Sequence, residues 1–268
     1  MAHFGLMEDK MGENNWQVGE KRYPGRWVFR KYIDHDFSKI EPSNLLIMVK
    51  SILDSIKNYF KPKFMDFVCF DKKELIEARI GGGNISPKRD LVSIFFNKNE
   101  DQLTKAINLF KGKDLILTHG SIKGETLLYV YDKNGNAKRC WKTNLTNFKK
   151  YPDIIPENNF LVFDIHGNLR RDERSDVDLD LETYSDIWLS KVRKVNDQTL
   201  LHYDNTELAK LNSKTLSFIL KSIKEIFKPD EIETWSGIDQ EACEKNLPNK
   251  LVTEKGFNQD RIKEIWTH

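Results

Sequence analysis

The stretch that decides the fold covers residues 160–189 and reads FLVFDIHGNLRRDERSDVDLDLETYSDIWL. Its second half alternates between acidic and aliphatic side chains. The acidic positions are Asp176, Asp178, Asp180 and Glu182, and the aliphatic positions between them are Val177, Leu179 and Leu181. Because strand side chains point to opposite faces in turn, this pattern predicts a strand with an aliphatic face on the core and an acidic face toward solvent.

The segment before this strand predicts a hairpin. Residues 160–164 are apolar enough for a strand, and His166, Gly167 and Asn168 have the composition of a turn into residues 169–172. A similar hairpin is predicted around residues 133–136, where Asn-Gly separates two short strand-like runs. Further strands are predicted at residues 26–33, 64–70, 91–96, 115–118, 126–132, 199–203 and 232–235.

Two long amphipathic helices are predicted at residues 44–60 and 213–227, since aliphatic side chains recur there at three- and four-residue spacing. Shorter helices are predicted at residues 71–79, 101–110 and 259–266, and glycine-containing turns at residues 81–83 and 119–124. The fold class that follows is α+β: a mostly antiparallel sheet with helices packed on one side.

The two long helices also suggest a duplication. Residues 51–62 read SILDSIKNYFKP and residues 218–229 read FILKSIKEIFKP. The organisation predicted from this similarity is a flexible arm at residues 1–20, an N-terminal α+β unit at 21–150 and a C-terminal α+β unit at 151–268. The alternative is that both units form one continuous domain.

Composition narrows the class of protein. The 268 residues are 39% hydrophobic and 31% charged, with a net charge of +2. There is no apolar run of the length that a membrane helix needs, and the first residues are polar, so we expect a cytoplasmic protein without a membrane partner. Three cysteines without a CxxC pair predict reduced thiols, and no motif predicts a cofactor.

The acidic strand has three interpretations. Four carboxylates on one face repel each other unless they are solvated, paired or bound. They can form a solvated outer face, a surface that binds a basic partner, or a magnesium site that uses Asp176 and Asp178. The sequence leaves these alternatives open.

The magnesium alternative is connected to a resemblance. Residues 167–179, GNLRRDERSDVDL, resemble the nucleotidyltransferase signature, in which a Gly-Ser turn holds a triphosphate and an Asp-x-Asp strand holds two metal ions. This resemblance implies metal ligation by Asp176 and Asp178. Asn168 stands where that family has serine, so the resemblance covers the carboxylates better than the phosphate-binding turn.

A second resemblance covers the C-terminal third. Residues 184–189 (YSDIWL), 211–216 (LNSKTL) and 251–258 (LVTEKGFN) are similar in order and type to segments of bacterial immunity proteins encoded beside polymorphic toxins. It implies a protein that binds and blocks a cognate toxin domain, with Asp176, Asp178, Asp180 and Glu182 as its partner-binding residues. The sequence contains none of the GxSxG, HExxH and Walker motifs that would predict an enzyme. The leading hypothesis is therefore a non-catalytic immunity protein.

A third hypothesis is a nucleic-acid-binding module. Its basis is a basic and aromatic patch that includes Lys142, Phe148, Lys149 and Lys150. Lysine contacts to phosphate and stacking of bases on aromatic rings would bind a single strand.

Overall fold

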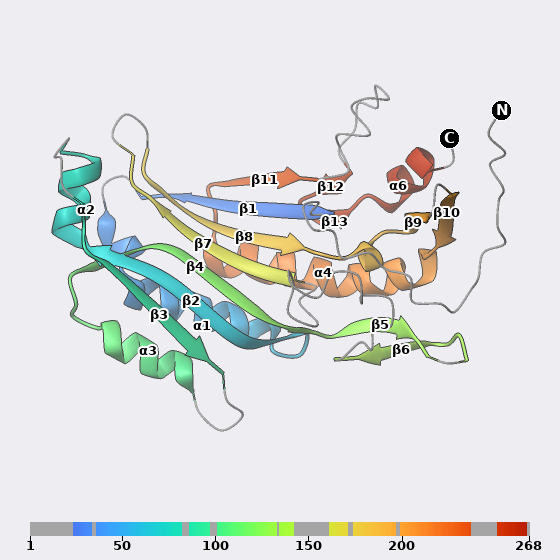
Figure 1. Ribbon diagram of the computed structural model, residues 1–268, viewed down its shortest axis with the longest axis horizontal. Coiled ribbons are helices and arrows are strands. Elements are labelled where there is room, and N and C mark those ends of the chain that lie inside the picture. The colour runs from blue at the N-terminus through green and yellow to red at the C-terminus, as the bar shows by residue number, and fades with distance from the viewer. Residues whose placement is uncertain are drawn as a thin grey trace.

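The computed structural model describes residues 24–33, 36–81, 86–96, 101–132, 134–141, 161–170, 174–196, 199–236 and 251–266. Its centre is a seven-stranded sheet in which every neighbouring pair is antiparallel, with the order β11-β1-β8-β7-β4-β2-β3 (Figure 1). The strands are β1 (Gly25–Tyr32), β2 (Phe60–Asp71), β3 (Arg89–Phe95), β4 (Leu115–Thr126), β7 (Leu161–Asn168), β8 (Asp176–Thr183) and β11 (Glu231–Trp235). The predicted α+β class is confirmed.

Smaller elements surround this sheet. Three two-stranded sheets are formed by β5 (Leu128–Tyr131) with β6 (Ala137–Cys140), β9 (Lys191–Asn196) with β10 (Thr199–Asp204), and β12 (Val252–Thr253) with β13 (Gly256–Phe257). The helices are α1 (Pro42–Ile56), α2 (Lys72–Arg79), α3 (Gln102–Phe110), α4 (Thr206–Phe227) and α6 (Gln259–Trp266), with short 3-10 turns η1 (Phe37–Ile40) and η3 (Asp186–Trp188). None of the helices within these described ranges is long and apolar enough to cross a membrane.

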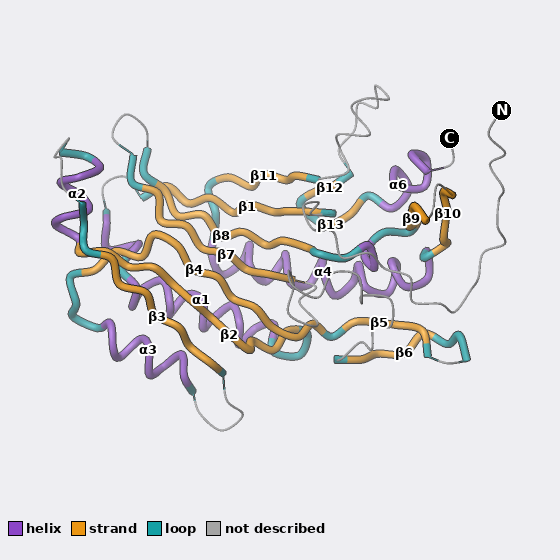
Figure 2. The backbone as a smooth tube through the Cα atoms, in the orientation of Figure 1, coloured by secondary structure: helices purple, strands orange, loops and turns teal. Residues whose placement is uncertain are grey.

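The two long helices lie on one face of the sheet. Figure 2 shows α1 and α4 behind the strands, with α2 at one end of the sheet. α1 contacts both α3 and α4, so these three helices form one layer. The predicted packing of helices on one side of an antiparallel sheet is therefore confirmed.

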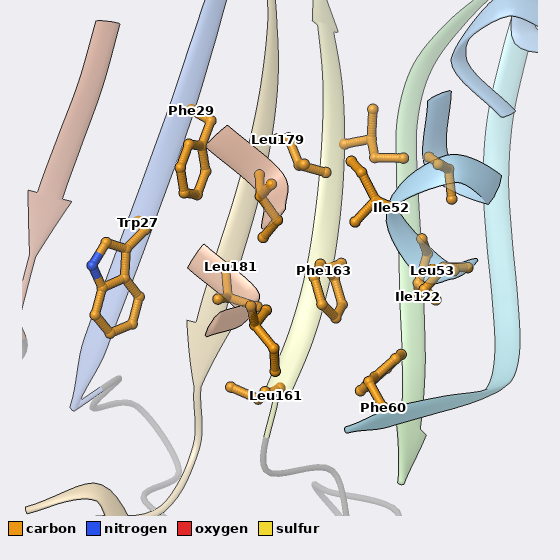
Figure 3. Packing of buried hydrophobic residues seen from close by; sticks show 14 of the residues in the cluster. Trp27, Phe29, Ile52, Leu53, Phe60, Ile122, Leu161, Phe163, Leu179 and Leu181 are labelled. Atoms are coloured by element: carbon orange, nitrogen blue, oxygen red, sulfur yellow. The ribbon is translucent and has the colours of Figure 1, made fainter. Parts of the chain in front are cut away.

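The core lies between this helical layer and the sheet. Leu179 and Leu181 of β8 lie beside Phe163 of β7, and Ile52 of α1 points toward them from the helical layer (Figure 3). All four side chains are almost fully buried. The alternation of residues 176–182 thus places its aliphatic side chains against the helices, as predicted.

Both halves of the chain contribute to the same sheet. β1, from the first half, pairs with β8 on one side and with β11 on the other. The boundary predicted near residue 150 therefore does not separate two sheets. The strand before α1 belongs to the main sheet, whereas β10, the strand before α4, pairs with β9 in a small one. The duplication remains a hypothesis.

Two predicted turns are wrong, because both segments are extended. β7 continues to Asn168 before the chain turns back into β8, and residues 119–124 lie inside β4. Gly167 allows β7 to pass close to the backbone of β4, since a Cβ at this position would lie 2.2 Å from the carbonyl oxygen of Leu117. The glycine pattern that resembles a turn reflects crowding between strands.

The predicted helix boundaries also need correction. α1 ends at Ile56, and Phe60, which continues the apolar spacing, begins β2. α4 begins at Thr206, seven residues before the predicted start, and ends at Phe227 as predicted, followed by Lys228 in the left-handed conformation. Phe60 is buried and keeps the spacing of α1 although it belongs to β2, whereas the first turns of α4 bury Leu208, Ala209 and Asn212 as part of the helix itself.

Candidate functional site: the open face of the sheet

The face of the sheet opposite α1 and α4 is the candidate site, and we call it the open face. Within the described residues no helix lies over its central strands (Figure 1). Three rows of directly paired residues cross all seven strands on this face. From β11 to β3 they are Trp235, Arg26, Glu182, Val162, Lys123, Phe64 and Phe95; then Glu233, Val28, Asp180, Asp164, Ser121, Asp66 and Ser93; then Glu231, Arg30, Asp178, His166, His119, Val68 and Leu91.

The open face is acidic, although the chain as a whole is basic. Its three rows contain seven carboxylates and three basic side chains, a formal charge of −4 with neutral histidines. The complete chain carries +2. The sheet therefore separates charges that are interspersed in the sequence, and its open face attracts positively charged groups.

The four carboxylates of β8 lie on the open face, as predicted, but their predicted exposure to solvent is wrong. Asp176 and Asp180 are 1% exposed, Glu182 is 5% and Asp178 is 7%. β8 is a central strand between β1 and β7, and long arginine side chains from β1 lie over it. Burial beneath arginines replaces the solvated acidic face that the alternation suggests.

Arg30 forms the best-defined contact of this face. Its Nε atom donates to Asp178 Oδ1 at 3.0 Å and its Nη2 atom donates to Asp178 Oδ2 at 3.2 Å. The remaining Nη1 atom donates to Glu233 Oε1 at 2.8 Å. One guanidinium therefore joins three strands, β8, β1 and β11, through a bidentate pair and a third bond. These contacts, led by the hydrogen bond to Asp178, raise the pKa of Arg30.

Arg26, on the same face of β1, contacts the next two carboxylates of β8, Asp180 and Glu182. It donates to Asp180 through Nε and Nη2, and its Nε atom lies 3.3 Å from Glu182 Oε1. Glu182 also accepts a hydrogen bond of 2.6 Å from the hydroxyl of Tyr184. Two arginines of β1 thus pair with three carboxylates of β8, which leaves one negative charge in excess.

Burial has an electrostatic cost at these carboxylates. Loss of solvation raises the pKa of Asp178, Asp180 and Glu182 above the ordinary values, although the arginines and Tyr184 act in the opposite direction. Desolvation is the larger effect at all three. The carboxylates are consequently destabilised as anions, and an additional cation at the face would relieve part of this cost.

The middle row contains acceptor atoms that are not used. Asp180 Oδ1 and Asp66 Oδ1 are buried and have no hydrogen-bond partner among the described residues. Asp164 lies between them in the same row, opposite Asp180 on β7. Buried acceptors without donors are uncommon, and they add to the electrostatic cost of this face.

The pair proposed for magnesium, Asp176 and Asp178, is occupied by protein groups. Asp176 Oδ1 accepts from Asn168 Nδ2 at 2.6 Å and its Oδ2 lies 3.6 Å from Arg170. Both oxygens of Asp178 accept from Arg30. In the described part of the chain, no three His, Cys, Asp or Glu side chains are grouped to hold a metal ion. The geometry therefore gives the nucleotidyltransferase alternative no support.

Two histidines meet at the centre of the open face. The Nδ1 atoms of His119 on β4 and His166 on β7 are 3.4 Å apart. The Nε2 atom of His166 lies 3.6 Å from Asp180 Oδ2. Spacing in the sequence does not predict this pair, because its members are 47 positions apart and meet only through the strand order.

Large apolar side chains are exposed at both edges of the open face. Trp235 on the edge strand β11 is 58% exposed, while Leu91 and Phe95 on the opposite edge strand β3 are 63% and 65% exposed. Aromatic side chains next to charged groups are typical of the residues that dominate protein–protein affinity. The acidic centre is thus flanked by apolar positions suited to a protein partner.

The basic and aromatic patch of Lys142, Phe148, Lys149 and Lys150 lies outside the described residues. The adjacent described residues make cation–π contacts instead: Lys61 lies 3.9 Å from the ring centroid of Trp141, and Arg139 lies over Tyr59 and Tyr129. The nucleic-acid hypothesis therefore remains a prediction from sequence.

The segments that resemble immunity proteins come together beside the middle of α4. Gln259 Nε2 donates to the carbonyl of Trp188 and to Ser213 Oγ, and Ser217 Oγ donates to the carbonyl of Lys255. Trp188 is fully buried. These contacts are within the chain, and they join the three segments into one packed corner. No protein-family model and no curated protein matches the chain.

Proposed function

We propose that the chain is a non-catalytic binding protein that docks a basic protein on the open face of its sheet. The partner class is the cognate toxin domain of a bacterial polymorphic system, and the chain neutralises it as an immunity protein. The class of partner rests on the resemblance of residues 184–189, 211–216 and 251–258. The docking surface rests on the open face.

One observation supports the proposal above all others: a face of formal charge −4 in a chain of charge +2. Charge complementarity steers a partner of opposite sign and suppresses partners of the same sign. A basic protein surface would offset the excess of carboxylates on this face. The same acidic face would repel the phosphates of a nucleic acid.

The apolar edges favour a protein over a small cation as the main partner. Trp235 and Phe95 lie at opposite ends of one row that crosses seven strands. At a strand spacing of about 4.8 Å, six intervals span about 29 Å, which is the scale of a protein interface. A partner that covers this row would bury both aromatic anchors and the acidic centre together.

The experiment is a growth-protection and co-purification assay with the candidate toxin domain encoded beside this chain. We expect co-expression of the wild-type chain to restore growth and the two proteins to co-purify at a fixed stoichiometry. The variant Asp164→Lys should lose protection, while Glu225→Lys, on the exposed surface of α4, should retain it. Failure of the wild-type chain to bind the domain or to restore growth would remove the proposal.

A further inference from the structure

The histidine pair at the centre of the open face has a geometry that a hydrogen bond explains poorly. The Nδ1 atoms of His119 and His166 are 3.4 Å apart, with ring centroids 5.0 Å apart and ring planes inclined by 43°. Hydrogen bonds with a nitrogen donor usually span about 2.7–3.2 Å. Two nitrogen ligands of a tetrahedral zinc ion, each about 2.05 Å from the metal, lie about 3.3 Å apart.

We propose that His119 and His166 bind one divalent transition-metal ion of the zinc class through their Nδ1 atoms. Imidazole nitrogen is a preferred ligand for zinc, cobalt and nickel. Water would complete the coordination, because His119 is exposed and the side chain of His166 is 32% exposed. The site is distinct from the Asp176 and Asp178 pair; it lies on the open face that we propose as the docking surface, and its metal titration does not require the toxin partner.

The surroundings of His166 suit a metal ligand. Its Nε2 atom lies 3.6 Å from Asp180 Oδ2, which is longer than a hydrogen bond, but the nearby negative charge favours the ring hydrogen on Nε2 and leaves the Nδ1 lone pair for a metal. A histidine whose second nitrogen faces a carboxylate is the usual arrangement at metal sites. Asp180 is thereby a positioning residue and does not touch the ion.

The surrounding charge also favours a cation. His166 lies directly opposite Asp178 on β8, and Asp164 is on the same face of β7 two residues away. On the other side, His119 is paired with Val68 of β2, and Ser121 follows on the same face of β4. Arg30 is the nearest basic group in this row, and Asp178 lies between it and His166. Anionic groups therefore outnumber cationic groups around the pair.

The strands hold the backbones of the two histidines side by side before metal binds. β4 and β7 are central strands of the sheet, and His119 and His166 are register partners in their ladder. A site on paired strands loses little conformational freedom on binding, which favours affinity even with two protein ligands.

The test is a titration of the full chain with Zn²⁺ by calorimetry, and with Co²⁺ by its visible absorption. We expect the wild type to bind one equivalent, and His119→Gln and His166→Gln each to abolish that binding. Asp180→Asn should weaken it by about 10- to 100-fold. His202→Ala, a histidine of β10 in a separate sheet, should bind like the wild type.

Folding of each variant is checked by circular dichroism and thermal unfolding, and glutamine is chosen because it keeps a polar side chain on the open face. Loss of the single equivalent in both glutamine variants, with binding retained in His202→Ala, supports the site. Absence of wild-type binding, or retention of the equivalent in either glutamine variant, overturns it.

Discussion

Arg30 of β1 and Asp178 of β8 lie directly opposite each other on neighbouring strands and form a bidentate ion pair, with N–O distances of 3.0 and 3.2 Å. The pair is well shielded, since the side chains are 18% and 10% exposed. It is separated by 148 positions in the sequence, and it holds an acidic strand at the centre of the sheet.

Removing the Arg30 side chain should therefore destabilise the folded protein. We expect Arg30→Met to lower the free energy of unfolding by about 3–5 kcal/mol, because it leaves Asp178 buried without its partner. Urea unfolding of the wild type and variant measures the loss. The double variant Arg30→Met/Asp178→Leu should recover much of it. A double variant whose loss equals the sum of the two single losses would show that the two side chains do not interact.

The core beneath β8 gives a second prediction. Leu179 is 1% exposed and lies between the sheet and the helices. Leu179→Ala should cost about 2–5 kcal/mol of unfolding free energy, from lost burial and the cavity that remains. Leu91→Ala on the exposed edge strand is the matched control and should change stability by about 0.5 kcal/mol or less. Equal effects at both positions would contradict the assignment of the two faces.

The third prediction concerns two glycines on the adjacent central strands β7 and β4. At Gly167 a Cβ atom would lie 2.2 Å from a backbone oxygen, whereas at Gly120 the nearest atom would be 3.6 Å away. Gly167→Ala must move β7 relative to β4, and we expect a loss of about 1–3 kcal/mol or more. Gly120→Ala fits at ordinary contact distance. Thermal unfolding of the two variants compares them, and a smaller loss at Gly167 than at Gly120 would be inconsistent with the strand packing.

The fourth prediction concerns pH. Burial raises the pKa of Asp180 in the folded state, so between the ordinary pKa and the raised value the folded protein binds more protons than the unfolded chain. The contribution of Asp180 to the free energy of unfolding therefore falls as pH rises through that range. Asp180→Asn removes this dependence, and the variant should gain stability relative to the wild type as pH increases.

Asp101 is the control of opposite sign. The hydrogen bond from Lys50 lowers the pKa of that carboxyl, so its contribution is present at neutral pH and is lost as pH falls. Asp101→Asn should accordingly lose stability relative to the wild type as pH increases. Urea unfolding at a series of pH values gives both differences. A flat or falling difference for Asp180→Asn would contradict the assigned pKa direction.

The sequence predicts the local features of the fold well, and for identifiable reasons. The alternation of residues 176–182 and the helical spacing of residues 45–56 depend on neighbours in the chain, and both predictions match the sides that face the core. The turn predicted at residues 166–168 is wrong because Gly167 is required by a contact with Leu117, on another strand. Composition alone cannot distinguish such a glycine from a turn glycine.

The candidate site could be predicted only in part. The alternation predicts the four carboxylates of β8 as one face. Arg26 and Arg30 lie two positions on either side of Val28, and this strand spacing could have indicated a basic face that pairs with the carboxylates. Their burial depends on which strand lies beside β8. The histidine pair and the row of Asp66, Asp164 and Asp180 depend on strand order as well, which local patterns do not contain.

The central claim is that the open face binds a basic protein, and the affinity of the candidate toxin domain tests it most directly. Calorimetry would compare the wild type with Trp235→Ala, whose side chain is 58% exposed on this face, and with Ile47→Ala, 51% exposed on α1. We predict that Trp235→Ala weakens binding by about 2 kcal/mol, about 30-fold in Kd, and that Ile47→Ala leaves it unchanged. Equal affinities for the wild type and Trp235→Ala, or a loss confined to Ile47→Ala, would contradict the account.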